Sequence, residues 1–204
     1  AGEMVNTEAI NFMVTQGRGL VCAPVNKEIA KRFKLNHMVI DGADPDEANF
    51  TISIDHKKLT TTGISAADRA NTIRELTNPD SKSSDFRRPG HIFPLLGVEG
   101  GVLRRAGHTE AALDLAKLAG LKPVGIICEI MREDGEMARV PELAKMAKDY
   151  GLTFITIKDL IAYRNKTESL VHEVMQMEMP TVYGDFTLYA FQESMTGDIH
   201  LALT

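Results

Sequence analysis

The stretch that sets the fold is GGVLRRAGHTEAALDLAKLAG, which runs from Gly100 to Gly120. It predicts a short apolar strand, GVLRR, then a turn at Gly107 and a helix that begins near Thr109. Gly120 ends this helix, because glycine readily takes the left-handed conformation that closes a helix. Two arginines, a histidine and a glutamate crowd around the turn, and such a group suits an anion or a metal better than a protein core.

The same alternation of strands and helices continues along the chain to about Arg164. Capping residues and apolar spacing predict helices over residues 6–17, 26–33, 65–76, 141–151 and 158–164. Strands are expected over residues 19–23, 48–56, 91–96, 124–131 and 153–157. In residues 48–56 we expect Phe50, Ile52 and Ile54 to be buried and Thr51 and Ser53 to face outward. This order favours a layered α/β or α+β domain.

The last forty residues differ in character, and we place a domain boundary after residue 164. The segment NKTESLVHEVMQMEMP is a charged, Met-rich connector. It is followed by TVYGDFTLYAFQ and IHLALT, which alternate like antiparallel strands. The predicted domains are therefore residues 1–164 and a short β-rich tail of residues 165–204.

Composition excludes several classes of protein. The net charge of −5 over 204 residues gives no basic footprint for nucleic acid, and no apolar run approaches a membrane span. No signal peptide is expected in the opening residues. The two cysteines, Cys22 and Cys128, form neither a disulfide framework nor a CxxC pair, so a cytoplasmic location is expected. Each is most simply a small buried hydrophobe.

Four segments carry the candidate chemistry, and the first two contain Glu129 and the turn at Gly107. Glu129 interrupts the apolar run VGIICEIM, and a buried carboxylate there is either one half of a salt bridge or a catalytic acid or base. At the turn, Arg104, Arg105 and the start of the helix suit a phosphate, and His108 could bind a metal or move a proton. The alternative is a capped helix with exposed charges.

Two further loops repeat this polar pattern. RRPGHIFPL contains His91 after a turn at Pro89, and TTTGISAADR places Thr61, Thr62 and Gly63 before a capped helix. A single histidine in such a position, as at His91, is more often structural than catalytic. Asp68 and Arg69, which follow Ser65 in this helix, are expected on its solvated face. Because each loop follows an apolar segment, we expect the loops to share one cleft.

Together these loops resemble 3,4-dihydroxy-2-butanone 4-phosphate synthase. The resemblance rests on TTTGISAADRANTI, DFRRPGHIFPL, GGVLRRAGHTEAALDLAKLAGLKP, VGIICEIMREDGEMARVPEL and ITIKDLIAYR, in the family's order and spacing. It implies a compact α+β domain and a homodimer with active sites near the subunit interface. It also implies conversion of ribulose 5-phosphate to 3,4-dihydroxy-2-butanone 4-phosphate and formate, a lyase reaction of riboflavin biosynthesis that uses Mg²⁺ or Mn²⁺.

The resemblance also assigns roles to residues. It implies that Glu129 and His91 are catalytic and that His108 is a metal ligand. The implied substrate-binding residues are Arg105, Ala106, Gly107, His108, Thr109, Thr62 and Cys22. Family members have an acidic loop that would precede Ala1 and supply a carboxylate ligand to the metal. We therefore expect the chain as given to fold and dimerise, but to bind Mg²⁺ poorly and release little formate until such a loop is restored in cis.

The tail MPTVYGDFTLYAFQESMTGDIHLALT resembles the opening strands of GTP cyclohydrolase II, which follows the synthase domain in bifunctional riboflavin enzymes. Two alternatives to the synthase remain open. One is a sugar-phosphate isomerase, which uses the same enediol chemistry without carbon loss. The other is a catalytically incomplete dimerisation module of a bifunctional enzyme. Formate release separates the synthase from both.

Overall fold

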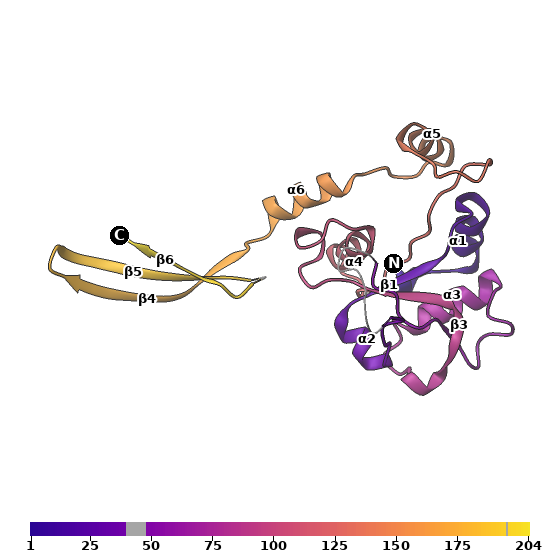
Figure 1. Cartoon of the computed structure of the whole chain (residues 1–204), viewed down its shortest axis with the longest axis horizontal. Coiled ribbons are helices and arrows are strands. Elements are labelled where there is room, and N and C mark those ends of the chain that lie inside the picture. The colour runs from indigo at the N-terminus through magenta and orange to yellow at the C-terminus, as the bar shows by residue number, and fades with distance from the viewer. Residues whose placement is uncertain (40–47, 195) are drawn as a thin grey trace. The chain divides into compact units, whose positions relative to one another are not determined.

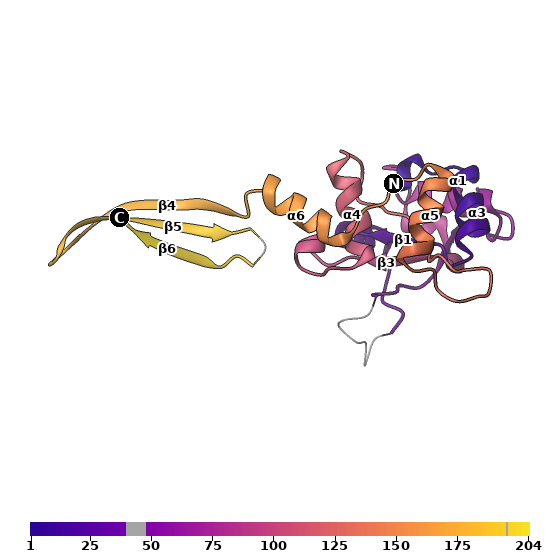
Figure 2. The same cartoon turned by 90° about the horizontal axis from the view of Figure 1, so that it is seen from above.

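A computed structural model describes residues 1–39, 48–194 and 196–204. The chain divides into two compact units, Ala1–Ile157 and Lys158–Thr204 (Figures 1 and 2). The division falls at the start of helix α6 (Ile157–Thr167), so the boundary expected after residue 164 lies inside this helix. The identities of the two predicted domains remain predictions.

A three-stranded mixed sheet lies at the centre of the first unit, in the order β1-β3-β2. β3 (Phe86–Leu96) is the middle strand. It pairs in parallel with β1 (Cys22–Val25) and antiparallel with β2 (Ile54–His56). Phe93 of β3 lies opposite Cys22, and Ile92 lies opposite Ile54, so this register brings segments distant in sequence to one sheet.

The helices of the first unit lie around this sheet, except the last of them, which stands apart from it in Figure 1. They are α1 (Thr7–Phe12), which continues as a π-helical turn Met13–Gly17, α2 (Lys27–Phe33), α3 (Ala66–Glu75), α4 (His108–Leu118) and α5 (Val140–Tyr150). The capping residues work as predicted, because Asn6, Asn26 and Ser65 each accept a backbone N–H of the following helix. α3 packs against α1 and against β2 and β3.

The core of the first unit is formed by apolar side chains from these elements. Its most deeply buried members include Ile10, Val21, Val25, Phe33, Ile54, Ile73, Leu76, Ile92 and Val124. Val21, Ala23 and Val25 face this core in alternation with Cys22, as a strand requires. This packing holds β1 and β3 in a fixed register beneath the polar loops.

Several strand predictions were wrong. Thr51 and Ser53 are buried and Ile52 is exposed, because the Thr51 hydroxyl and amide both bond to Pro94 O, across to β3. Residues 124–131 form isolated bridges to residues 18–25 rather than a regular strand. Gly101–Leu103 is a 3₁₀ turn, and the turn expected at Pro89 lies within β3. Residues 153–156 have no regular structure, with Phe154 and Ile155 exposed.

The second unit contains α6 and an antiparallel sheet of β4 (Val171–Thr181), β5 (Gly184–Glu193) and β6 (Ile199–Leu203). The predicted antiparallel strands are confirmed by β5 and β6. The expected connector is wrong, because most of it forms β4, paired along its length with β5. β4 and β6 are almost wholly exposed in this chain. The helices and mixed sheets confirm the α+β class.

Candidate functional site

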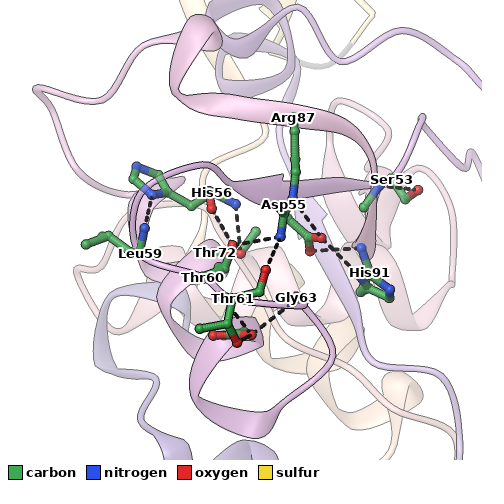
Figure 3. Close-up of polar contacts among 12 residues, drawn as sticks. Ser53, Asp55, His56, Leu59, Thr60, Thr61, Gly63, Thr72, Arg87 and His91 are labelled. Carbon is green, nitrogen blue, oxygen red and sulfur yellow. Dashed lines mark hydrogen bonds and ion pairs between the residues drawn. The ribbon is translucent and has the colours of Figure 1, made fainter.

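His91 lies on β3 and is held by the buried carboxylate of Asp55, at the end of β2 (Figure 3). Asp55 Oδ1 accepts the backbone N–H of His91 at 2.9 Å, and Oδ2 lies 2.8 Å from His91 Nδ1. The Asp55 side chain is 1% exposed, whereas that of His91 is 43% exposed. Arg87 Nε lies 3.4 Å from Asp55 Oδ2 and supplies a positive charge to the pair.

The loop of Thr60 to Gly63 packs against this pair. Arg87 Nη2 donates to Thr60 Oγ1 and to Thr61 O, which ties the loop to β3. A Cβ added at Gly63 would lie 2.1 Å from Asp55 Oδ2 and 2.5 Å from His91 Nδ1, so only glycine fits here. Thr62, the candidate substrate-contacting residue, is exposed and directly precedes this contact.

Asp68 anchors the other side of the same loop, and its predicted place on a solvated helix face was wrong. Its side chain is buried, and Oδ2 accepts the Thr61 N–H, the Thr61 hydroxyl and the Gly63 N–H. Burial alone would raise the pKa of Asp68, but the hydrogen bonds from Gly63, Thr61 and Ser65 outweigh it and lower the pKa. The loop therefore rests on a carboxylate at the start of α3.

The turn from Arg105 to Thr109 leads into α4. Gly107 is the N-cap residue and gives no side-chain cap, so the first backbone N–H groups of α4 have no partner from this residue. Arg105 Nη1 donates to Glu110 Oε2 at 2.8 Å, and Glu110 is 1% exposed. A Cβ at Gly107 would lie 2.4 Å from Arg105 Nη1, so glycine lets this ion pair cross the turn. Ala106 and His108 are exposed, and Thr109 is buried.

Glu129 is exposed, so the prediction of a buried carboxylate was wrong. Its Oε2 accepts the Leu20 N–H at 2.8 Å, because the chain passes close by at Gly19, where a Cβ would lie 2.5 Å from Glu129 O. Residues 124–131 follow the sheet only through bridges, which leaves this side chain at the surface. Only the burial of Glu129 is corrected by the structure, and its catalytic role remains a prediction for an accessible carboxylate.

Cys22 lies beside this carboxylate and on the same sheet face as His91. It is buried, as predicted. Burial chiefly, and then the charge of Glu129, raise the pKa of the Cys22 thiol to about 12. Cys22 is paired with Phe93, two residues after His91, and strand alternation places these three side chains on one face. The thiol is neutral at physiological pH, which favours a packing role over a nucleophilic one.

Sequence reasoning missed two carboxylates, Asp55 and Glu110, that hold the predicted site residues in place. Asp55 had a signal, because it interrupts the strand-like segment TISIDH with a charge next to an apolar residue. Glu110 looked like an ordinary first-turn acid of a helix, and only the fold reveals its contact with Arg105.

A divalent metal was expected at His108, and the described residues do not form its site by themselves. Within residues 1–39, 48–194 and 196–204, no three His, Cys, Asp or Glu side chains are gathered around one point. Mg²⁺ requires near-octahedral oxygen coordination, which a single exposed imidazole does not supply.

Comparison with known proteins decides the family. The family described as 3,4-dihydroxy-2-butanone 4-phosphate synthase matches residues 1–163. The chain belongs to this synthase family. It is 55% identical over 201 residues to the riboflavin biosynthesis protein RibBA of Bacillus cytotoxicus and 56% identical to that of Bacillus mycoides. Each match covers 98% of this chain and 50% of the relative, so the chain spans about half the length of these curated relatives.

Solved structures of the synthase family share the fold. RibBX of A. baumannii, a two-domain synthase, matches with a TM-score of 0.86 and 46% identity, over 100% of this chain and 60% of its own. A synthase in complex with two magnesium ions matches with a TM-score of 0.77 and 45% identity, over 82% and 83% of the two chains. Within the described residues, no helix is long and apolar enough to cross a membrane.

Proposed function

We propose that this chain carries the synthase activity, the conversion of ribulose 5-phosphate to 3,4-dihydroxy-2-butanone 4-phosphate and formate. The observation that carries the proposal is the Gly107 turn, where an uncapped helix N-terminus adjoins a guanidinium fixed by Glu110. Backbone N–H groups, the helix dipole and a planar guanidinium together suit a phosphate dianion. The reaction belongs to the lyase class and to riboflavin biosynthesis.

The proposed chemistry begins with loss of a proton from a carbon beside the carbonyl, which gives an enediol. This step needs a base that the substrate can reach, and we assign it to the imidazole of His91, whose side chain is 43% exposed. The enediol then loses water and rearranges its carbon skeleton, and a water molecule is taken up again before formate is released. The sum of the two products equals the substrate, so no oxidant or reductant is needed. Glu129, as an exposed carboxylate, is the proposed second proton carrier.

The remaining substrate contacts are proposed from the position of the phosphate. Arg105, Ala106, Gly107, His108 and Thr109 would surround it, while Thr62 and Cys22 would lie along the sugar. Cys22 offers a buried neutral thiol that narrows the site.

Divalent metal use is the expectation for this family, because a related synthase is complexed with two magnesium ions. We propose Mg²⁺, or Mn²⁺ in its place, with His108 as one ligand and oxygen ligands beyond those that the described residues gather. When bound, such an ion would stabilise the negative charge of an enediolate.

A homodimer with active sites near the interface is also proposed. The apolar side chains of Leu152, Phe154 and Ile155 are each about half exposed in the single chain, and such a segment is typical of an interface. A cytoplasmic location is proposed because both cysteines are free thiols. The tail is proposed as the start of a cyclohydrolase II-like domain.

Two neighbouring arginines provide the test. Arg105→Ala should raise the KM for ribulose 5-phosphate at least about tenfold, since a charged hydrogen bond contributes roughly 1.5–3 kcal/mol. Arg104→Ala is the matched control, because Arg104 is exposed and adjacent. Steady-state rates of formate release at saturating Mg²⁺ give the KM of each variant. Equal KM values for the two variants would remove Arg105 from the phosphate site.

A further inference from the structure

His56 is the last residue of β2, and its buried imidazole has no part in the chemistry proposed above. The residue is 6% exposed, and its ring packs edge-to-face against Phe86 of β3, with 5.5 Å between the ring centroids. The backbone of His56 is tied as well, since its N–H donates to Thr72 Oγ1 of α3 at 3.1 Å and its carbonyl accepts the Thr60 hydroxyl. His56 is therefore anchored to both β3 and α3.

The imidazole accepts two backbone hydrogen bonds from the turn that follows it. His56 Nδ1 accepts the N–H of Lys58 at 3.3 Å and the N–H of Leu59 at 3.1 Å, and Figure 3 shows the ring beside Leu59. Asparagine and aspartate side chains accept the N–H groups two and three residues further along in the same way when they cap a turn or a helix. Since a ring nitrogen accepts only through its lone pair, Nδ1 must be unprotonated.

This turn leads directly into the loop of Thr60 to Gly63, where Thr62 is the proposed contact to the sugar. Leu59 O accepts Asn71 Nδ2 at 3.0 Å, so the end of the turn is also tied to α3. Lys58 and Leu59 are exposed, and without an acceptor at Nδ1 their N–H groups would turn toward water. The start of the loop would then lose its fixed position, and Thr62 would move with it.

We propose that His56 is a positioning residue for substrate binding, whose unprotonated Nδ1 caps the turn of Lys58 and Leu59 and so sets the place of Thr62. The proposal rests on the proposed function for its effect on the substrate. The alternative is that His56 only fills the space beside Phe86. The alternative needs the ring, whereas the proposal needs an acceptor at the position of Nδ1.

Two substitutions separate the acceptor from the ring. His56→Asn places Oδ1 as many bonds from the backbone as Nδ1 but removes the ring, and His56→Phe keeps a ring but has no acceptor. In a protein that contains this chain, we expect His56→Phe to raise the KM for ribulose 5-phosphate at least about threefold, as loss of a capping acceptor would. Its kcat should change little, and His56→Asn should keep the wild-type KM. Steady-state formate release at saturating Mg²⁺ gives both constants.

Two NMR measurements test the same contact without turnover. At a pH of about 8, where an ordinary imidazole is neutral, we expect a scalar coupling through the hydrogen bond between the Leu59 amide nitrogen and His56 Nδ1 in the wild type. Hydrogen exchange at the Gly63 amide reports on the loop, because this N–H donates to Asp68 Oδ2 at 2.9 Å. We expect wild-type exchange in His56→Asn and exchange at least about threefold faster in His56→Phe.

Each outcome decides the proposal. A wild-type protein without the coupling would overturn it, as would a folded His56→Phe protein with wild-type KM and Gly63 exchange. A KM raised equally in the two variants would assign the effect to the lost imidazole ring and would also overturn it. If His56→Phe does not fold, the wild-type coupling and the KM of His56→Asn decide. A wild-type protein that releases no formate would contradict the proposed function instead, while the coupling and the Gly63 exchange would still test His56.

Discussion

At the scale of single residues, Glu129 is the position where structure and sequence differ most. Its carboxylate is exposed and accepts one backbone N–H, from Leu20, so replacing it with glutamine keeps that bond. Glu129→Gln should therefore fold normally and lower the rate of formate release at least about 10²-fold if the residue carries protons.

Glu136→Gln is the control for this change, since Glu136 is also exposed and lies seven residues further along. Thermal melting of both variants checks the fold, and kcat checks the chemistry. A Glu129→Gln protein that releases formate as fast as the Glu136→Gln protein would leave Glu129 with no catalytic role.

Motifs in the sequence name His91 and Arg105 as candidate site residues, and their roles remain predictions. The sequence gives only a weak signal for the supporting carboxylate of Asp55 and none for that of Glu110, because each acts across a turn or between strands. The predicted burial was wrong at Asp68 and at Glu129, because it depends on contacts that local sequence does not specify. Asp68 is buried because hydrogen bonds satisfy its carboxylate, and Glu129 is exposed because the backbone around it is irregular.

At the scale of elements, the loop of Thr60 to Gly63 depends on Asp68 at the start of α3. Asp68→Asn should lower the free energy of unfolding at pH 7 by about 1–3 kcal/mol, because hydrogen bonds to a charged group are lost or weakened. The folded-state pKa of Asp68 lies below its ordinary value, so this stabilisation is present above about pH 4 and is lost as the pH falls through the folded pKa.

Urea unfolding of the wild type and of Asp68→Asn from pH 7 to about pH 3 measures this effect. The difference between their free energies of unfolding should become smaller as the pH approaches 3. Asp80→Asn makes the same change of charge at an exposed site, and its free energy of unfolding should equal that of the wild type. A difference between Asp68→Asn and wild type that stays constant with pH would contradict the assigned role of the carboxylate.

Helices could be predicted better than strands. Asn6, Asn26 and Ser65 are local signals that cap a helix whatever surrounds it. The segments at 124–131 and 153–157 have strand-like composition, but a strand also needs a partner along its length, which local sequence does not specify. β4 shows the converse, because its charged residues pair along β5 despite a composition typical of a connector.

At the scale of the whole molecule, the two units differ in how far their side chains are buried. The first has a closed apolar core, whereas β4 and β6 of the second are almost wholly exposed in this chain. A sheet exposed in this way gains stability by packing against further structure. The matches to RibBA proteins cover 98% of the chain, so the second unit is shared with these relatives.

Conversion of ribulose 5-phosphate to a four-carbon phosphate and formate can be followed by ¹H NMR of a purified protein that contains this chain, with ribulose 5-phosphate and Mg²⁺. We expect one formate for each sugar phosphate consumed, and loss of the formate signal when His91 is replaced by glutamine. Consumption of ribulose 5-phosphate into another pentose phosphate without formate would identify an isomerase instead. If a folded protein that contains this chain consumes no ribulose 5-phosphate at all, the proposed synthase activity is wrong.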